Sequence, residues 1–216
     1  MEFLIILVIS AALIAAWQFT GLRRAGSGAH QDPVVEAERT LRIIPERFVV
    51  LDLETTGLDP ERHEIIEIAA IRVNRGSIPH DTFQSLVKPK RKVPRTITEM
   101  TGITQAMLDV DGKPLEEVLR EFREFVGDLR LIAYNTKFDM AFLQCAAERV
   151  GIEFSNEVSC ALTMVRRAWP HRDRFKLKDI SNDGGLDMSD QHRALADCKR
   201  ILVVYNASVA ELQQLE

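Results

Sequence analysis

Four carboxylates and one histidine constrain the fold of this chain more than any other feature of its sequence. They are, in chain order, Asp52, Glu54, Asp139, His192 and Asp197. Each stands where local structure should direct it toward a common point, so the fold must bring the ends of distant strands and helices together. A cluster of hard oxygen donors with a nearby base is typical of a two-metal site that cleaves phosphodiesters.

The composition is that of an ordinary globular protein, with 46% hydrophobic and 28% charged residues in a chain of 216. The net charge of −4 gives no sign of a polyanionic partner. A carboxylate-rich metal site lowers the formal charge and is then neutralised by its ions, so this signal is weak. The cysteines Cys145, Cys160 and Cys198 form no CxxC pair. We predict that they are small buried residues in a reducing compartment.

The N-terminus carries an apolar segment long enough to cross a membrane. Residues 3–22 contain no charge and would give ~30 Å of helix, just enough to span a bilayer. Arg23 and Arg24 follow at once, and no Lys or Arg precedes the segment. The positive-inside rule therefore predicts a single-pass anchor over residues 1–22 with the catalytic body in the cytoplasm. The alternative is a cleaved signal peptide with its cleavage site in Ala-rich residues 11–16, although such signals usually carry their positive charge first.

A linker and one folded domain are predicted to follow the anchor. Residues 23–33 are small, polar and turn-forming, which is typical of a flexible tether. Residues 34–44 could form a short amphipathic helix. We therefore assign residues 23–45 to a linker and residues 46–216 to a single domain, which is long enough to bury one core.

The order of the predicted elements indicates an α/β protein with a mixed sheet. Short links between the first three apolar runs suit an antiparallel meander. The expected elements are strands over residues 48–54, 64–74 and 81–89, a helix over 114–128, a strand over 129–135, and helices over 140–151, 161–169 and from about 193 to the end. Three strands followed by alternating helix and strand predict a mixed α/β sheet.

Asp52 and Glu54 are two residues apart on a predicted strand, so their side chains share one face. Apolar residues occupy the alternate positions. The two carboxylates should therefore leave the strand end together, beside a turn that Gly57 makes possible. Such oxygen ligands suit Mg²⁺ or Mn²⁺ rather than zinc. Taken alone, the pair could also be solvated carboxylates at a strand end.

The other three groups stand at the starts of predicted helices. Asp139 opens a helix after a strand, where an acid also favours the helix dipole, and Asn135 just before it is a helix cap or a hydrogen-bond partner of the substrate. His192 and Asp197 would be ~140° apart on one helix, so we expect His192 on the loop or first turn and Asp197 inside the helix. A carboxylate in that mostly apolar stretch needs a partner, and a metal is a good one.

Jointly these motifs resemble the DEDDh 3′→5′ exonuclease family, typified by bacterial proofreading subunits, oligoribonuclease and ribonuclease T. The resemblance covers about residues 46–205 and rests on DLETTG, NTKFDMAFL and HRALADC, which occur in the family's order. The His-x4-Asp spacing is that of the histidine subgroup. The implied fold is ribonuclease H-like, a mixed five-stranded sheet flanked by helices, preceded here by one N-terminal transmembrane helix.

The resemblance implies a role for each matching position. Asp52, Glu54 and Asp197 would hold the first of two Mg²⁺ (or Mn²⁺) ions, and Asp139 would join Asp52 around the second. His192 would deprotonate the attacking water, a task that imidazole suits near neutral pH. The product would be a nucleoside 5′-monophosphate released from the 3′ end of single-stranded DNA or RNA.

Further positions match the part of the family that binds substrate. Thr55, Thr56 and Leu58 correspond to residues that grip the terminal nucleotide, with Leu58 as a wedge beside the base. The chain departs from the family at Tyr134, where members often carry His, and at Cys198, where they often carry Ala. Neither departure touches the five chemical positions. The family includes monomers and dimers, so a homodimer stays open.

The leading hypothesis is a membrane-tethered, two-metal exonuclease. A non-catalytic, membrane-tethered adaptor that binds nucleic acid on the same fold would predict the loss of a metal ligand, yet all five positions are filled. A hydrolase of short oligonucleotides is a further alternative. Two basic runs, residues 88–95 and 172–178, are solvated faces or contacts to a nucleic-acid backbone. The second run precedes His192 and is the better candidate for such contacts.

Overall fold

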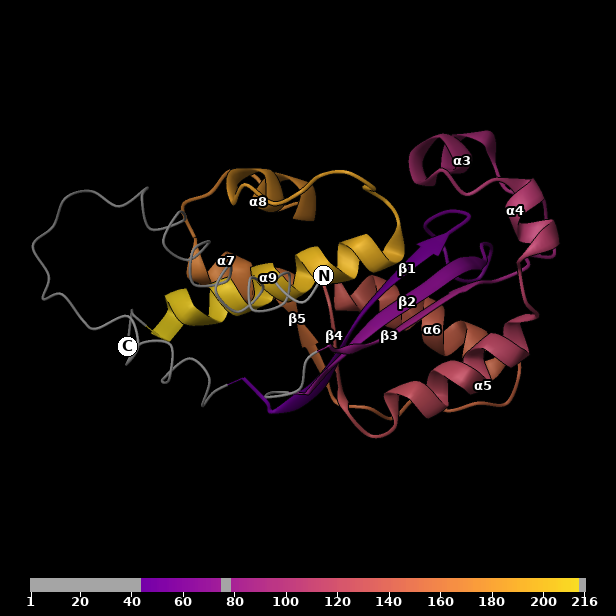
Figure 1. Ribbon diagram of the computed structural model, residues 1–216, viewed down its shortest axis with the longest axis horizontal. Helices are drawn as coiled ribbons and strands as arrows, with labels where there is room; N and C mark the ends of the chain where they lie inside the picture. Colours follow the sequence, from indigo (N-terminus) through magenta and orange to yellow (C-terminus); the bar gives the residue numbers. More distant parts are fainter. Residues whose placement is uncertain (1–43, 75–78, 214–216) are drawn as a thin grey trace, which may run out of the picture.

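The computed structural model describes residues 44–74 and 79–213, and its elements carry the labels of Figure 1. A five-stranded sheet has the order β3-β2-β1-β4-β5. Its strands are β1 (Arg47–Thr55), β2 (Ile65–Asn74), β3 (Asp81–Leu86), β4 (Arg130–Ala133) and β5 (Val158–Cys160). β2 is antiparallel to β1 and β3, whereas β4 is parallel to β1 and β5 is parallel to β4. The mixed sheet expected from the sequence is thus confirmed.

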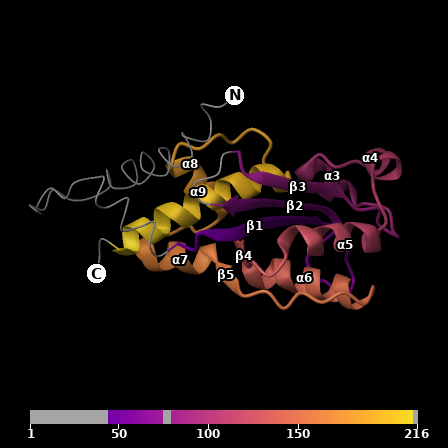
Figure 2. The same cartoon turned by 60° about the horizontal axis from the view of Figure 1, so that its bottom comes forward.

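Helices cover both faces of the sheet. They are α3 (Arg95–Thr101), α4 (Gln105–Val110), α5 (Leu115–Val126), α6 (Thr136–Glu148), α7 (Ala161–Ala168), α8 (Leu177–Asp183) and α9 (Ala194–Gln213). Figure 2 shows α9 on one side of the sheet and α5 and α6 on the other. The long helices and the first four strands lie where the sequence predicts them. The short elements α3, α4, α8 and β5 were not predicted from local patterns.

The alternation of residues in β1 divides the core into two layers. Val49, Leu51 and Leu53 are buried in a cluster with residues of α5 and α6. Phe48 and Val50 are buried in a second cluster with residues of α9. Because side chains alternate along a strand, the positions that follow Phe48 and Val50 in steps of two also face α9. The carboxylates of β1 occupy those positions.

The register of β1 and β2 changes at the end that carries the carboxylates. Glu54 pairs with Glu67, but Thr55 pairs with Ile65, so Ile66 is left without a partner as a β-bulge. Ile66 is fully buried in a separate cluster with Leu108 of α4. The bulge therefore lets the segment of α3 and α4 pack on the same end of the sheet.

The predicted transmembrane helix over residues 1–22 lies outside the described residues, as does the predicted linker through residue 43. None of the helices in the described part of the chain is long and apolar enough to cross a membrane.

Candidate active site

Three separate elements bring the five predicted groups together. Asp52 and Glu54 come from β1, Asp139 from the first turn of α6, and Asp197 from the first turn of α9. His192 precedes α9 by two residues, as the spacing predicted. Ligand atoms of Glu54, His192 and Asp197 lie within 4.8 Å of one another. The charges of Asp139, Glu54 and Asp197 all act on Asp52, which places the remaining two carboxylates in the same cluster.

Burial and mutual repulsion disfavour the charged forms of these acids. Burial raises the pKa of Asp52 well above its usual value, and the negative charge of Asp139 raises it further. Burial and the charge of Asp197 raise the pKa of Glu54 to about 8, although Arg193 partly offsets this. Burial also raises the pKa of Asp139 to about 7. A site of this kind favours added positive charge.

The donor set fits divalent cations that prefer oxygen. Glu67 joins the four predicted carboxylates, because it is fully buried and lies opposite Glu54 on β2. In the described part of the chain, the ion pairs that reach this cluster are Arg193 with Glu67 and Arg200 with Asp197. Five carboxylates thus face two guanidinium groups. Carboxylate oxygens are the ligands that Mg²⁺ and Mn²⁺ favour, so the residues present fit such ions.

His192 lies on a loop with an uncommon backbone conformation. Its φ is 59°, and Asp190 has a φ of 55°. Both residues therefore adopt the left-handed region, which is uncommon for residues other than glycine. The backbone N–H of His192 donates to Oδ2 of Asp197 at 3.1 Å, which joins the loop to α9. The imidazole is exposed, so solvent water reaches it.

The two remaining partners of the site, Glu67 and Arg200, were not found from the sequence. Glu67 accepts from the backbone N–H of Ala194 at 3.0 Å and from Nη2 of Arg193 at 2.9 Å. Nη1 of Arg200 donates to Oδ1 of Asp197 at 2.8 Å. A signal for Glu67 does exist, because it is the one charged residue inside the apolar run IIEIAAI. A charge in a buried strand needs a partner.

The predicted substrate residues fall into two groups. Thr55 and Thr56 are buried, and their hydroxyls fix the turn after β1, where Thr55 donates to Gly57 O and Thr56 accepts from Glu64 N. Leu58 is 84% exposed and stands free for contact with a ligand. Asn135 occupies the N-cap position of α6, but its exposed side chain makes no capping hydrogen bond. Asn135 is thus the N-cap residue of α6 as expected, but only its backbone carbonyl accepts a hydrogen bond from the helix, from Phe138 N at 2.8 Å. A role in substrate binding stays a prediction.

Gly57 does not provide the conformational freedom that the sequence suggested for the turn. It does not have a positive φ. A Cβ at this position would instead lie 2.3 Å from the ring of His63. A larger residue at position 57 would therefore require the His63 ring to move.

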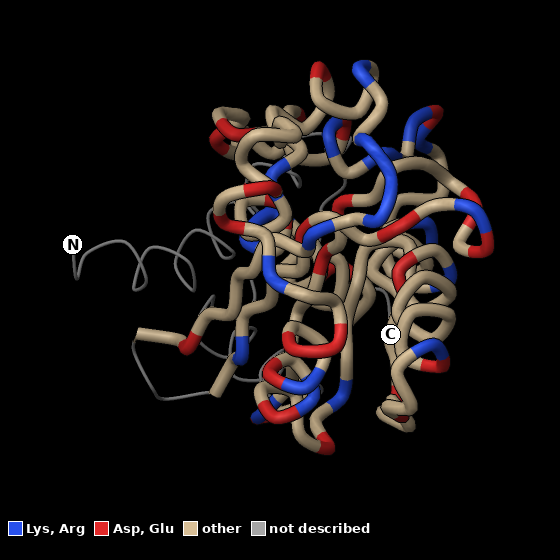
Figure 3. The backbone as a smooth tube through the Cα atoms, turned by 90° about the vertical axis from the view of Figure 1, so that its right-hand side faces the viewer, with Lys and Arg blue, Asp and Glu red and all other residues tan. Residues whose placement is uncertain are grey.

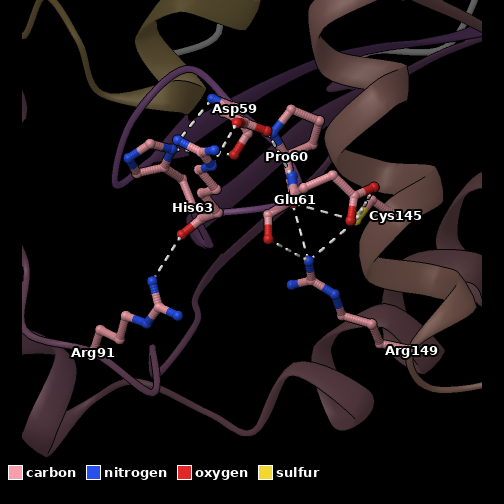
Figure 4. Close-up of polar contacts among 8 residues, drawn as sticks. Asp59, Pro60, Glu61, His63, Arg91, Cys145 and Arg149 are labelled. Carbon is pink, nitrogen blue, oxygen red and sulfur yellow. Dashed lines mark hydrogen bonds and ion pairs between the residues drawn. The ribbon is translucent and has the colours of Figure 1, made fainter.

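Several contacts hold the loop between β1 and β2 in place (Figure 4). The Asp59 N–H donates to Nδ1 of His63 at 3.2 Å. From α6 and the residue after it, Sγ of Cys145 and Nη2 of Arg149 donate to the carbonyl oxygen of Pro60, at 3.2 and 3.0 Å. The exposed Leu58 therefore lies on a loop whose following residues are held by hydrogen bonds from α6 and the residue after it.

The residues that depart from the family pattern have structural roles. The hydroxyl of Tyr134 donates to the carbonyl oxygen of Phe175. Phe175 is half-buried and packs against the buried cluster of Val165 and Ile180. Cys198 is fully buried, and its Sγ donates to Ala69 O at 3.4 Å.

A mixed sheet with an acidic cluster and a histidine at the end of its central strand defines a nuclease of ribonuclease H-like fold that depends on divalent metal. The chain belongs to the DEDDh 3′→5′ exonuclease family, since the family model described as "Exonuclease" matches residues 49–205. This match falls within the predicted domain, whose boundaries at residues 46 and 216 stay a prediction.

Relatives of the chain include DNA polymerase III proteins. The chain is 38% identical over 166 residues to the DNA polymerase III subunit epsilon of Aquifex aeolicus, covering 76% of this chain and 81% of that one. It is 35% identical over 170 residues to the PolC-type DNA polymerase III of Clostridium perfringens, covering 78% of this chain but 12% of the polymerase. The chain therefore spans most of the first relative and a small part of the second.

Solved structures with the same fold include exonuclease I of E. coli in complex with a dT13 oligonucleotide. The TM-score is 0.69 at 19% identity, covering 79% of this chain and 42% of that one. At this identity the likeness concerns the fold.

Proposed function

We propose that this protein is a two-metal 3′→5′ exonuclease that shortens single-stranded DNA or RNA from the 3′ end and releases nucleoside 5′-monophosphates. The observation that carries the proposal is the convergence of Asp52, Glu54, Asp139 and Asp197 with His192 at one end of the sheet. The relatives add support, because one is a DNA polymerase III subunit and one solved structure holds an oligonucleotide.

Two Mg²⁺ or Mn²⁺ ions would be held by Asp52, Glu54 and Asp197 on one side and by Asp139 with Asp52 on the other. Bound there, they would stabilise the attacking and leaving oxygens of the phosphodiester. The chain's own contribution is to gather the carboxylates in a buried site. The pKa values of Glu54 and Asp139 are raised because the site disfavours more negative charge, so it favours the binding of a cation.

His192 is the proposed general base. It is exposed at the edge of the carboxylate cluster, so its ring can accept a proton from a water next to Glu54 and Asp197. The hydrogen bond from its backbone N–H to Asp197 would keep this part of the loop next to the carboxylate cluster.

The terminal nucleotide would lie along the turn after β1. Leu58 offers an exposed apolar side chain for contact with a base. Asn135, at the start of α6, offers a side-chain amide that makes no capping hydrogen bond. Within the two basic runs, Arg95 forms an ion pair with Glu99 and Arg172 forms one with Asp183, and backbone contacts by the other cations stay a prediction. On the side formed by α3 to α6, Lys and Arg positions are interspersed with Asp and Glu positions (Figure 3).

We further propose that residues 1–22 tether the enzyme to the cytoplasmic membrane as a single-pass anchor. The support is the uncharged apolar run and the arginines that follow it. Fractionation of cells that express the full chain tests this. Release from the membrane fraction by high salt alone would contradict a spanning anchor.

The function is tested with the full chain in detergent and 5′-labelled single-stranded DNA and RNA of equal sequence. We expect a ladder that shortens from the 3′ end with Mg²⁺ and no cleavage with EDTA. The faster substrate identifies the target, and strands of several lengths distinguish a nuclease from a hydrolase of short oligonucleotides. A folded protein that binds the strands with Mg²⁺ but cleaves none of them would favour a non-catalytic adaptor.

A further inference from the structure

The loop that carries His192 is held from one end by the single side chain of Arg200. This arginine lies on α9, one turn after Asp197, and is 5% exposed. Its Nε donates to the carbonyl oxygen of Asp187 at 2.9 Å, and Nη2 donates to the carbonyl oxygen of Ser189. Its Nη1 donates to Oδ1 of Asp197 at 2.8 Å. One guanidinium thus joins the start of the loop to a residue of the candidate metal site.

The other end of the loop is held by Glu67 on β2. This carboxylate accepts from the backbone N–H of Ala194 and from the side chain of Arg193. His192 lies between the two attachments. The left-handed conformations of Asp190 and His192 require such support, because the surrounding structure must stabilise them.

We propose that Arg200 is a positioning residue for His192. By fixing the carbonyl groups of Asp187 and Ser189, it holds the loop in the shape that places the imidazole beside Glu54 and Asp197. This inference rests on the proposed function, in which His192 is the general base.

The geometry calls for arginine rather than for any cation. A guanidinium presents donors in a rigid plane and reaches three acceptors at once. A lysine at this position would keep the charge beside Asp197, but one ammonium group cannot span both carbonyl oxygens and the carboxylate in the same way. Arg200→Lys therefore keeps a positive charge beside Asp197 but removes the hydrogen bonds to the loop carbonyls. It tests the support of the loop separately from the ion pair.

The main test compares Arg200→Lys with Lys199→Met, a control at the neighbouring exposed position of the same helix. We expect Arg200→Lys to lower kcat at least ~10-fold, as loss of an outer-shell partner typically does, with KM little changed. Lys199→Met should behave as the wild type. In a His192→Ala background, Arg200→Lys should have almost no further effect, because the two residues act through one group.

Hydrogen exchange measured by NMR provides a readout that does not depend on activity. In Arg200→Lys, the amide of His192 should exchange faster, because its bond to Asp197 depends on the shape of the loop, whereas amides of β1 and β2 should not change. In the wild type, the buried Nε–H of Arg200 should exchange slowly, and this measurement needs no variant to fold. Fast exchange of that group would overturn the proposal.

Three further results would also overturn it. The first is an unchanged His192 amide in folded Arg200→Lys. The second is an effect of Arg200→Lys on kcat that is as large in the His192→Ala background as in the wild type. The third is complete recovery of Arg200→Lys at high Mg²⁺, which would mean that Arg200 acts on metal binding through Asp197. An inactive but folded wild type would instead refute the proposed function, and the exchange measurements would still decide the role of Arg200.

Discussion

Asp197 shows how one residue can serve the metal site and the loop of His192 together. One carboxylate oxygen accepts from Arg200, and the other accepts from the backbone N–H of His192. Its side chain is 14% exposed, and a carboxylate oxygen lies within 4.8 Å of ligand atoms of Glu54 and His192. A change at this position should therefore remove a metal ligand and also loosen the loop.

Asp197→Ala should reduce cleavage more than ~100-fold, because loss of even an outer-shell partner of a metal typically costs 10–100-fold. The fold should persist, since the helix keeps its buried face. Cleavage rate and circular dichroism check this. Asp128→Ala, which removes a 98% exposed carboxylate far along the chain, is the matched control. Full activity in folded Asp197→Ala would refute the assignment of the site.

Leu58→Ala should raise KM by roughly tenfold, the effect of losing one favourable contact to a base. The free energy of unfolding should stay within about 0.5 kcal/mol of the wild type, as at other surface positions. Val110 on α4 is 81% exposed and provides an apolar control away from the turn. Equal KM values for Leu58→Ala, Val110→Ala and the wild type would show that Leu58 is not a wedge.

The positions of the five chemical groups could be predicted because each depends on a local rule. Alternation along β1 puts Asp52 and Glu54 on one face, and helical geometry separates His192 from Asp197. The attachment of the His192 loop to Glu67 could not be predicted in this way. It depends on Arg193, which is 126 residues away in sequence, and only the packing of α9 on β2 brings the two together. The chemical roles of all these residues stay predictions.

At the scale of elements, long segments could be predicted from local patterns, whereas short segments could not. The predicted helix over residues 114–128 contains α5, because its buried residues recur at helical spacing over three turns. α3 and α4 have 7 and 6 residues, too few for a period to be recognised. β5 has three residues and is defined by its parallel pairing with β4, because so short a segment shows no sequence pattern. Its presence was expected only from the resemblance to the family.

Phe122→Ala should destabilise the protein by about 3–5 kcal/mol, the usual cost of removing a buried aromatic ring. Phe122 on α5 is fully buried, and its ring centroid lies 5.3 Å from that of Phe83 and 5.7 Å from that of Phe154. Denaturant unfolding measures the change. The kcat of the folded fraction should not change, because the carboxylates of β1 face α9. A loss below about 1 kcal/mol would mean that α5 is less tightly packed than the structure indicates.

At the scale of the whole molecule, the site should set how stability depends on pH and metal. The pKa of Glu54 rises on folding from 4.5 to about 8, and that of Asp139 rises from 3.8 to about 7. The folded protein therefore holds more protons than the unfolded chain between these values. Since stability falls with pH wherever the folded state binds more protons, the metal-free protein should become less stable as pH rises toward about 8.

The comparison is best made between pH 6.5 and 8.0. Burial lowers the pKa of His80 below its ordinary value of 6.5, which gives the opposite slope at lower pH. In EDTA, the Tm of the wild type should be lower at pH 8.0 than at pH 6.5. A loss of 1 kcal/mol corresponds to about 3 °C in a domain of this size. Saturating Mg²⁺ should restore stability at pH 8.0, because it binds the folded site.

Glu54→Gln isolates the cause of this slope. The amide has no charge to bury, so the metal-free variant should be more stable than the metal-free wild type at pH 8.0, and its Tm should change less between the two pH values. It should gain less from Mg²⁺, since a neutral amide oxygen binds the ion more weakly than a carboxylate does, and it should lose cleavage. A variant that keeps the full slope would show that Glu54 does not carry it. Equal gains from Mg²⁺ in both proteins would count against Glu54 as a metal ligand, because loss of a ligating negative charge should weaken the binding of a divalent cation.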